Sequence, residues 1–158
     1  MNDLPKSADR VRKAAEALGL TIEIVEMATP TRTVAEAAAA CRCPEGAIVK
    51  SLIFKGQQTG RPYLLLVSGA NRVDEQMAAA TLGETLLRPD ASYVRTVTGF
   101  AIGGVPPFGH ATPVVSFMDA DLLQYETVWA AAGTPMAVFA VDPKRLKDAT
   151  GAEAIAVK

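Results

Sequence analysis

The chain has 158 residues, of which 49% are hydrophobic and 21% charged, and its formal net charge is -1. This composition is that of an ordinary globular protein and excludes an intrinsically disordered chain, which needs low hydrophobicity and high net charge. The length is typical of one domain, so we expect residues 1–158 to fold as a single domain with its own core.

Composition also limits the classes of partner and ligand that the protein is expected to bind. No apolar run approaches the ~18 residues of a membrane span, and residues 1–10 lack the apolar segment of a signal peptide, which predicts a cytoplasmic protein without membrane contact. The low net charge argues against binding along DNA but leaves contact with one short nucleic-acid end open. Cys41, Cys43 and the single histidine are too few ligands for a closed zinc site, so no metal is expected.

Apolar residues at helical spacing predict helices, and alternating or continuous apolar runs predict strands. In the first half of the chain, the expected elements are a helix over 7–18, a strand over 21–27, a helix from a capping box at Thr33 through Ala40, strands over 49–55 and 62–68, a helix over 73–82, a strand at 86–87 and a helix over 90–98. After a Gly/Pro-rich segment come strands over 114–118, 128–130 and 136–141, a helix from Asp142-Pro143 to Gly151, and a strand over 154–157.

Several of these strands are joined by turns too short for a helical crossover, and such pairs must be antiparallel. The sequence therefore predicts an α+β fold with a mixed, largely antiparallel, β-barrel-like sheet and flanking helices. Neither G-x-G-x-x-G nor G-x-x-x-x-G-K-[ST] is present, so no nucleotide cofactor is expected through those motifs.

Lys50 is the first candidate for chemistry. It shares one face of its expected strand with Leu52 and Phe54, where a lysine must either extend its charged end to solvent or sit in a cavity. If the lysine has only a structural role, its charged end extends to solvent. If it has a functional role, the ammonium binds a phosphate or an oxyanion.

The second candidate is the segment from Gly99 to His110. Gly103 and Gly104 would let backbone N–H groups approach a ligand, and the two prolines that follow would stiffen the loop. Such a loop is either an ordinary turn or an anion-binding site, and an apolar wall of Phe100, Ile102, Val105 and Phe108 beside it favours a small-ligand pocket.

Other candidates are weaker. A lone histidine such as His110 is more often structural than catalytic, and with no matching Ser and Asp spacing it disfavours a triad hydrolase. Cys41 is expected to be a small core residue. Six cations belong either to a solvated surface or to one mouth that seats phosphates: Lys50, Lys55, Arg61, Arg72, Arg88 and Arg95.

Three stretches together resemble the YbaK/ProX-like aminoacyl-tRNA deacylases, relatives of the editing domain of bacterial prolyl-tRNA synthetase. They are Thr31 to Ala38, Ile48 to Phe54, and Gly99 to Gly109. The order and spacing match over residues 8–150, and the lysine strand followed by G-x-x-x-P, Gly103 to Pro107 here, is the more specific pair.

The resemblance implies an enzyme that hydrolyses, in trans and without a cofactor, the ester of a mischarged aminoacyl-tRNA. The tRNA would be the one for proline, carrying alanine, cysteine or 2-aminobutyrate, and the partners would be the tRNA acceptor end and prolyl-tRNA synthetase. Ala132 stands where cysteine-editing relatives carry serine, which favours a small aliphatic group. The alternatives are a non-catalytic module that binds aminoacyl-tRNA ends and a small-molecule binder.

The resemblance also implies roles for individual residues. Lys50 would anchor the terminal phosphate or ribose, and Gly103 and Gly104 would orient the ester carbonyl through their N–H groups. Substrate contacts are implied for Thr31, Thr33, Phe100, Ile102, Val105, Pro107 and His110.

Overall fold

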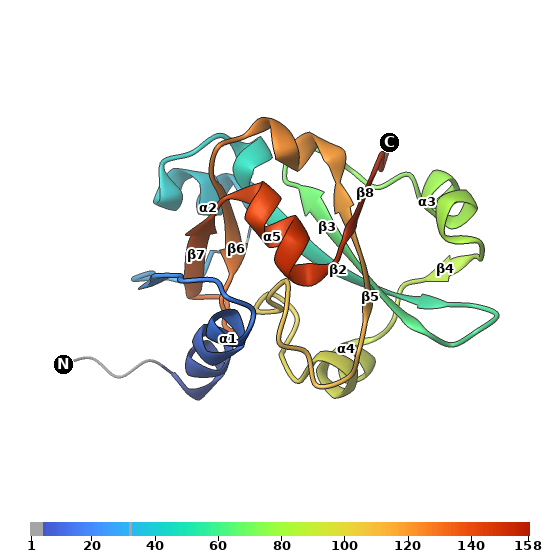
Figure 1. The fold of residues 1–158 in the computed structure, drawn as a ribbon, viewed down its shortest axis with the longest axis horizontal. Coiled ribbons are helices and arrows are strands. Elements are labelled where there is room, and N and C mark those ends of the chain that lie inside the picture. Colours follow the sequence, from blue (N-terminus) through green and yellow to red (C-terminus); the bar gives the residue numbers. More distant parts are fainter. Residues whose placement is uncertain (1–4, 32) are drawn as a thin grey trace.

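The computed structural model describes residues 5–31 and 33–158 (Figure 1). Five α-helices are present in this part of the chain: α1 Lys6–Ala17, α2 Val34–Cys41, α3 Glu75–Leu82, α4 Ala91–Thr98 and α5 Pro143–Thr150. The strands are β1 Ile24–Glu26, β2 Val49–Gly56, β3 Pro62–Ser68, β4 Leu86–Leu87, β5 Val115–Asp119, β6 Val128–Ala131, β7 Ala137–Val141 and β8 Glu153–Ile155. Two 3₁₀ helices, η1 Glu45–Ala47 and η2 Ala120–Gln124, were not predicted. None of the helices in 5–31 and 33–158 has the length and apolar character to cross a membrane.

Helix ends coincide with residues that cap helices. The Thr33 side chain accepts a hydrogen bond from the Glu36 N–H at 3.1 Å and begins α2, as the capping box predicted. Asp90 begins α4 in the same way by accepting one backbone N–H of the first turn, and Asp142 begins α5 by accepting two. Gly99 ends α4 with a φ of 80°, which a residue with a side chain rarely adopts.

The strands form two sheets (Figure 1). The larger has the order β4-β2-β3-β5-β8, and the smaller has the order β1-β7-β6. The pairs β2–β3, β2–β4, β1–β7 and β6–β7 are antiparallel, whereas β3–β5 and β5–β8 are parallel. A single parallel bridge between Ile48 and Trp129 joins the two sheets. The mixed sheet is confirmed, but the closed barrel-like form is not, because the described strands make two sheets.

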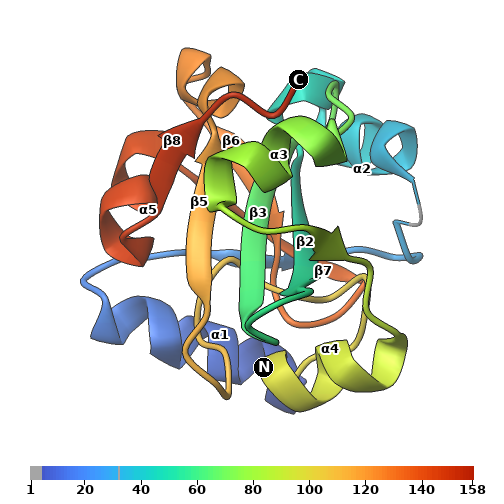
Figure 2. The same ribbon diagram turned by 90° about the vertical axis from the view of Figure 1, so that its right-hand side faces the viewer.

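Alternate residues of β3 face two cores. Leu64 and Leu66 belong to the main core between the two sheets, which also receives Phe139 of β7. Leu65 and Val67 face the second core, which α3 covers on the other side of the larger sheet (Figure 2). Burial on both faces explains why this strand is a continuous apolar run.

Helix α1 fixes both ends of the Gly99–Gly109 loop. The Arg10 guanidinium donates a hydrogen bond to the Gly99 carbonyl oxygen at 3.1 Å and lies over the Phe100 ring, 4.4 Å from its centroid. At the other end, a Cβ on Gly109 would lie 2.8 Å from Cβ of Ala14. The loop is therefore held against the fold.

Candidate functional site

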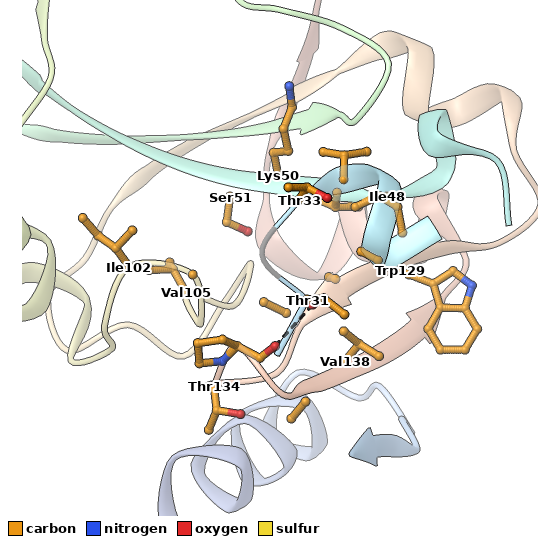
Figure 3. Close-up of a pocket in the computed structure, with 18 of the residues that line it drawn as sticks. Thr31, Thr33, Ile48, Lys50, Ser51, Ile102, Val105, Trp129, Thr134 and Val138 are labelled. Carbon is orange, nitrogen blue, oxygen red and sulfur yellow. Dashed lines mark hydrogen bonds between the residues drawn. The ribbon is translucent and has the colours of Figure 1, made fainter. Parts of the chain in front are cut away.

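Two cavities meet at β2. The first, of about 340 Å³, lies between β2, the loop 102–105, the β6–β7 turn and the start of α2 (Figure 3). Its walls are mainly small and apolar, and they include Ala37, Ala130, Ala137 and Val138. An apolar hollow with few polar groups is the usual form of a small-ligand site.

The second cavity, of about 320 Å³, lies on the α4 side of the same strand and loop. Arg72 and Arg88 line it together with Phe54 and Val94, so it combines cations with an apolar floor. Six of the described residues line both cavities: Lys50, Ser51, Leu52, Ile102, Gly103 and Val105. A ligand with two unlike parts can occupy both cavities by crossing this shared boundary.

The Lys50 ammonium is held in a defined place. It donates a hydrogen bond to the Asn71 carbonyl oxygen at 2.5 Å. Burial lowers the pKa of Lys50, while the charge of Asp119 raises it and that of Arg72 lowers it. In Figure 3 the Lys50 side chain extends to the opposite side of β2 from that of Ser51.

Asn71 is fixed by a buried network. Its side-chain amide donates to Asp119 Oδ2 at 2.8 Å and to Asp121 Oδ2 at 2.7 Å. Asp119 is only 2% exposed, and it also accepts the backbone N–H groups of Ser68 and Asp121. The carboxylate that compensates the Lys50 charge is thus anchored at the end of β5.

The two glycines of the loop differ in what their N–H groups can do. The Gly104 N–H donates to the Ala101 carbonyl at 3.0 Å, and the Gly104 carbonyl accepts from the Gly133 N–H at 2.9 Å. Gly103 lines both cavities, has a φ of 91°, and its N–H has no hydrogen-bond partner in the described part of the chain. Of the two N–H groups, only that of Gly103 is available to a ligand.

Thr31 and Thr33 line the first cavity as expected. The Thr31 hydroxyl donates to the Pro135 carbonyl at 3.2 Å, and the Thr33 hydroxyl caps α2. Both oxygens have structural partners, so their contribution to a ligand is mainly shape. Ile102 and Val105 also line the cavities, and Ile102 is 59% exposed at their boundary.

Three residues that the resemblance implied do not line either cavity. Phe100 is buried beneath Arg10, and Pro107 is buried in the loop. The His110 ring forms a hydrogen bond with the Pro106 carbonyl at 2.7 Å, and burial lowers its pKa. Phe100 and Pro107 thus belong to the buried packing of the loop, and His110 is held within it by a hydrogen bond. Ala132 is also fully buried and outside the first cavity.

The described lining residues of both cavities include no His, Asp or Glu, and their one amine, that of Lys50, donates to the Asn71 carbonyl and extends to the opposite side of β2 from Ser51. Burial, with a smaller effect of Cys43, raises the pKa of Cys41 to about 11, and this thiol packs beside a small core as expected. Within the described residues, no group of three or more metal-ligating side chains is present. The site is suited to positioning an already reactive bond.

Sequence reasoning missed three polar residues of this site. Ser51 lines both cavities, Asn71 holds Lys50, and Asp119 holds Asn71. Ser51 had a signal, because its place after Lys50 on a strand puts it on the opposite face. Asn71 and Asp119 are 48 positions apart, and only the packing of strands β3 and β5 brings them together.

Known proteins share this fold and sequence pattern. The family model described as an aminoacyl-tRNA editing domain matches residues 28–149. A crystal structure of a protein proposed to be a trans-editing enzyme for prolyl-tRNA synthetase is 48% identical, with a TM-score of 0.93 over 99% of both chains. The hypothetical protein APE2540 is 34% identical, with a TM-score of 0.86 over 94% of this chain and 98% of that one. The uncharacterised Bacillus subtilis protein YwhH is 29% identical over 126 residues, 80% of each chain.

Proposed function

Because this chain belongs to the aminoacyl-tRNA editing domain family, we propose that it hydrolyses the ester between a small amino acid and the terminal adenosine of a mischarged tRNA. The observation that carries the proposal is the pair of unlike cavities that meet at Lys50, Ser51 and Gly103. An aminoacylated nucleotide has the same two unlike parts, a small side chain and a charged, aromatic nucleotide.

The two cavities divide the ligand between them. The first cavity receives the amino-acid side chain, since its walls are apolar and small. The second receives the terminal nucleotide, with the base against Phe54 and Val94 and the phosphate near Lys50, Arg72 and Arg88. The ester then lies at the shared boundary.

The chemistry at that boundary needs little beyond positioning. Water adds to the ester carbonyl carbon, the carbon–oxygen bond to the ribose breaks, and the ribose oxygen takes the proton that the water loses. An aminoacyl ester is already activated, so correct placement and stabilisation of the carbonyl oxygen provide most of the rate enhancement. The free N–H of Gly103 is the backbone donor for that oxygen, and the neighbouring ribose hydroxyl positions the water.

Selection among amino acids follows from the walls of the first cavity. Ala130, Ala137 and Val138 present methyl groups and no charge, so alanine, cysteine and 2-aminobutyrate fit better than polar residues. One methylene changes binding in an apolar pocket by only ~1–3 kcal/mol, which makes steric exclusion the main selector. The tRNA for proline is the proposed carrier because of the relative proposed to act in trans for prolyl-tRNA synthetase.

The direct test is release of free amino acid from tRNA charged with alanine, cysteine, serine, threonine or 2-aminobutyrate. We expect release with the small apolar group at the highest rate, a loss of about 100-fold in Lys50→Ala, and near wild-type rates in Lys55→Ala. Lys55 is the matched control because it lies on the same strand, over the Tyr93 ring and outside both cavities.

The alternative, a non-catalytic module for aminoacyl-tRNA ends, has one observation in its favour: the described residues of the cavities include no His, Asp or Glu to act as a general base. It predicts binding of the charged acceptor end without release of amino acid.

Binding to tRNA is expected to weaken steeply with salt, because Lys50, Arg72 and Arg88 would contact phosphates. A prolyl-tRNA synthetase partner would supply recognition that these three cations do not.

A further inference from the structure

The Ser51 hydroxyl is an exception among the buried polar groups of the described residues. Its Oγ is shielded from solvent and has no hydrogen-bond partner. A buried hydroxyl without a partner destabilises the folded state, and nearly all such groups in proteins are paired. An unpaired one beside a cavity is therefore a candidate for contact with a ligand.

Ser68, on the neighbouring strand β3, shows what a structural serine does in this sheet. Its hydroxyl donates to the Gly46 carbonyl at 2.7 Å and accepts from the Ala70 N–H at 3.4 Å. Ser68 thereby ties β3 to η1. Ser51 has no equivalent role, because it connects no two elements through its side chain.

The position of Ser51 indicates where a ligand group could form the hydrogen bond that its hydroxyl lacks. The residue lines both cavities, and its side chain extends to the side of β2 that faces the first cavity, away from the Lys50 ammonium (Figure 3). Gly103 and Val105 line the same boundary from the loop. A serine hydroxyl moves between staggered positions by one rotation, so it can adjust to an arriving group without a change in the strand.

We propose that Ser51 Oγ contacts the substrate and donates its hydrogen bond to the ester carbonyl oxygen at this boundary. The inference rests on the proposed function. During attack by water, the carbonyl electron pair moves to that oxygen, which Ser51 and the Gly103 N–H stabilise together. Ser51 forms and breaks no covalent bond, since the described lining residues include no His, Asp or Glu to accept its proton and the Lys50 amine extends to the opposite side of β2.

The Ser51→Ala variant tests this role by opposite effects on activity and stability. Loss of a donor to the developing negative charge is expected to lower kcat by about 10–100-fold, with little change in KM. The midpoint of thermal unfolding is expected to stay the same or rise, because the variant removes an unpaired buried hydroxyl. Ser51→Cys, which keeps a weak donor of similar shape, is expected to retain intermediate activity.

Ser68→Ala is the matched control for stability, and it should lower the unfolding midpoint because it removes the hydrogen bond to the Gly46 carbonyl. Wild-type kcat in Ser51→Ala, or a loss of stability as large as that of Ser68→Ala, overturns the role of Ser51 while the proposed function stands. A wild-type protein that releases no amino acid from any charged tRNA overturns the proposed function, and the contact with the ester falls with it.

Discussion

The Lys50 ammonium on β2 donates its hydrogen bond to the backbone carbonyl of Asn71, in the segment that follows β3. The charge of Lys50 is therefore placed by a residue 21 positions away, and that residue is fixed in turn by two carboxylates. This network therefore fixes the position at which the Lys50 ammonium can bind a phosphate.

The charges around Lys50 predict how its titration responds to substitution. The charged groups that face it are Asp119, which raises its pKa, and Arg72, which lowers it, with Asp121 beyond Asn71. Lys50 loses its proton as the pH rises through a value below the ordinary 10.5, so Lys50-dependent activity falls there. Arg72→Gln is expected to move this fall to higher pH and Asp119→Asn to lower pH, as measured by rates corrected for spontaneous hydrolysis. Shifts in the same direction for both variants would contradict the assignment.

The packing of Gly104 predicts that a single methyl group will displace the loop. A Cβ on Gly104 would lie 2.8 Å from the Gly133 carbonyl carbon and oxygen and from Thr134 Cα. Gly104→Ala is expected to lower kcat/KM about 10-fold or more, because the loop carries the Gly103 N–H. The control is Gly60→Ala, which is strained by a φ of 72° but has open space around it. It should lose stability and keep activity; equal activity losses would argue against a role for the loop.

The size of the first cavity predicts a change in substrate preference. Ala131 lines this cavity and is only partly buried, so a larger side chain can be accommodated without disrupting the core. Ala131→Leu is expected to reduce the rate with 2-aminobutyryl-tRNA about 10-fold more than the rate with alanyl-tRNA. Ala120→Leu, on an exposed site outside the cavity, should leave the ratio of the two rates unchanged. An unchanged ratio in Ala131→Leu would place the amino-acid side chain elsewhere.

The buried carboxylate of Glu84 predicts a loss of stability in acid. Hydrogen bonds from Tyr63, from Thr59 and from the Gln58 N–H lower its pKa from 4.5 to about 2. Because the folded state favours the charged form, the stabilisation is complete above the unfolded pKa and is lost as the pH falls towards 2. Glu84→Gln should unfold at a lower temperature than wild type at pH 7.

The difference between wild type and Glu84→Gln should narrow between pH 5 and pH 2 in thermal unfolding scans. Glu75→Gln is the control, because the exposed pair of Glu75 with Arg88 contributes little to stability. A difference that is constant with pH would show that the Glu84 charge is not what the network stabilises.

Local signals in the sequence predicted most of the elements, because caps and glycines mark their ends. The helix from Thr33 and the strand over 62–68 have the expected limits or nearly so. The parallel pairs β3–β5 and β5–β8 were not foreseen, since they depend on which distant segments pack together. The two short 3₁₀ helices lack the periodicity that identifies a longer helix.

The candidate-site residues that the sequence predicted correctly as cavity-lining are those whose residue type is unusual at its position. Lys50 on an apolar strand and Gly103 in a stiff loop both line the cavities. His110 and Phe100 do not, because sequence proximity to the loop could not say which side of it they occupy. The Asn71–Asp119 contact could not be predicted from the sequence, because it depends on the register of the strands.

The central claim, that an aminoacylated 3′ end lies across β2, is tested most directly by a crystal structure with a non-hydrolysable analogue. Alanine linked by an amide to 3′-amino-3′-deoxyadenosine keeps both parts of the ligand. The account predicts the alanine methyl in the first cavity, the carbonyl oxygen near Ser51 and Gly103, and the adenosine on the Arg72 and Arg88 side. An analogue bound outside these cavities, or with the adenosine among the alanines of the first cavity, would contradict it.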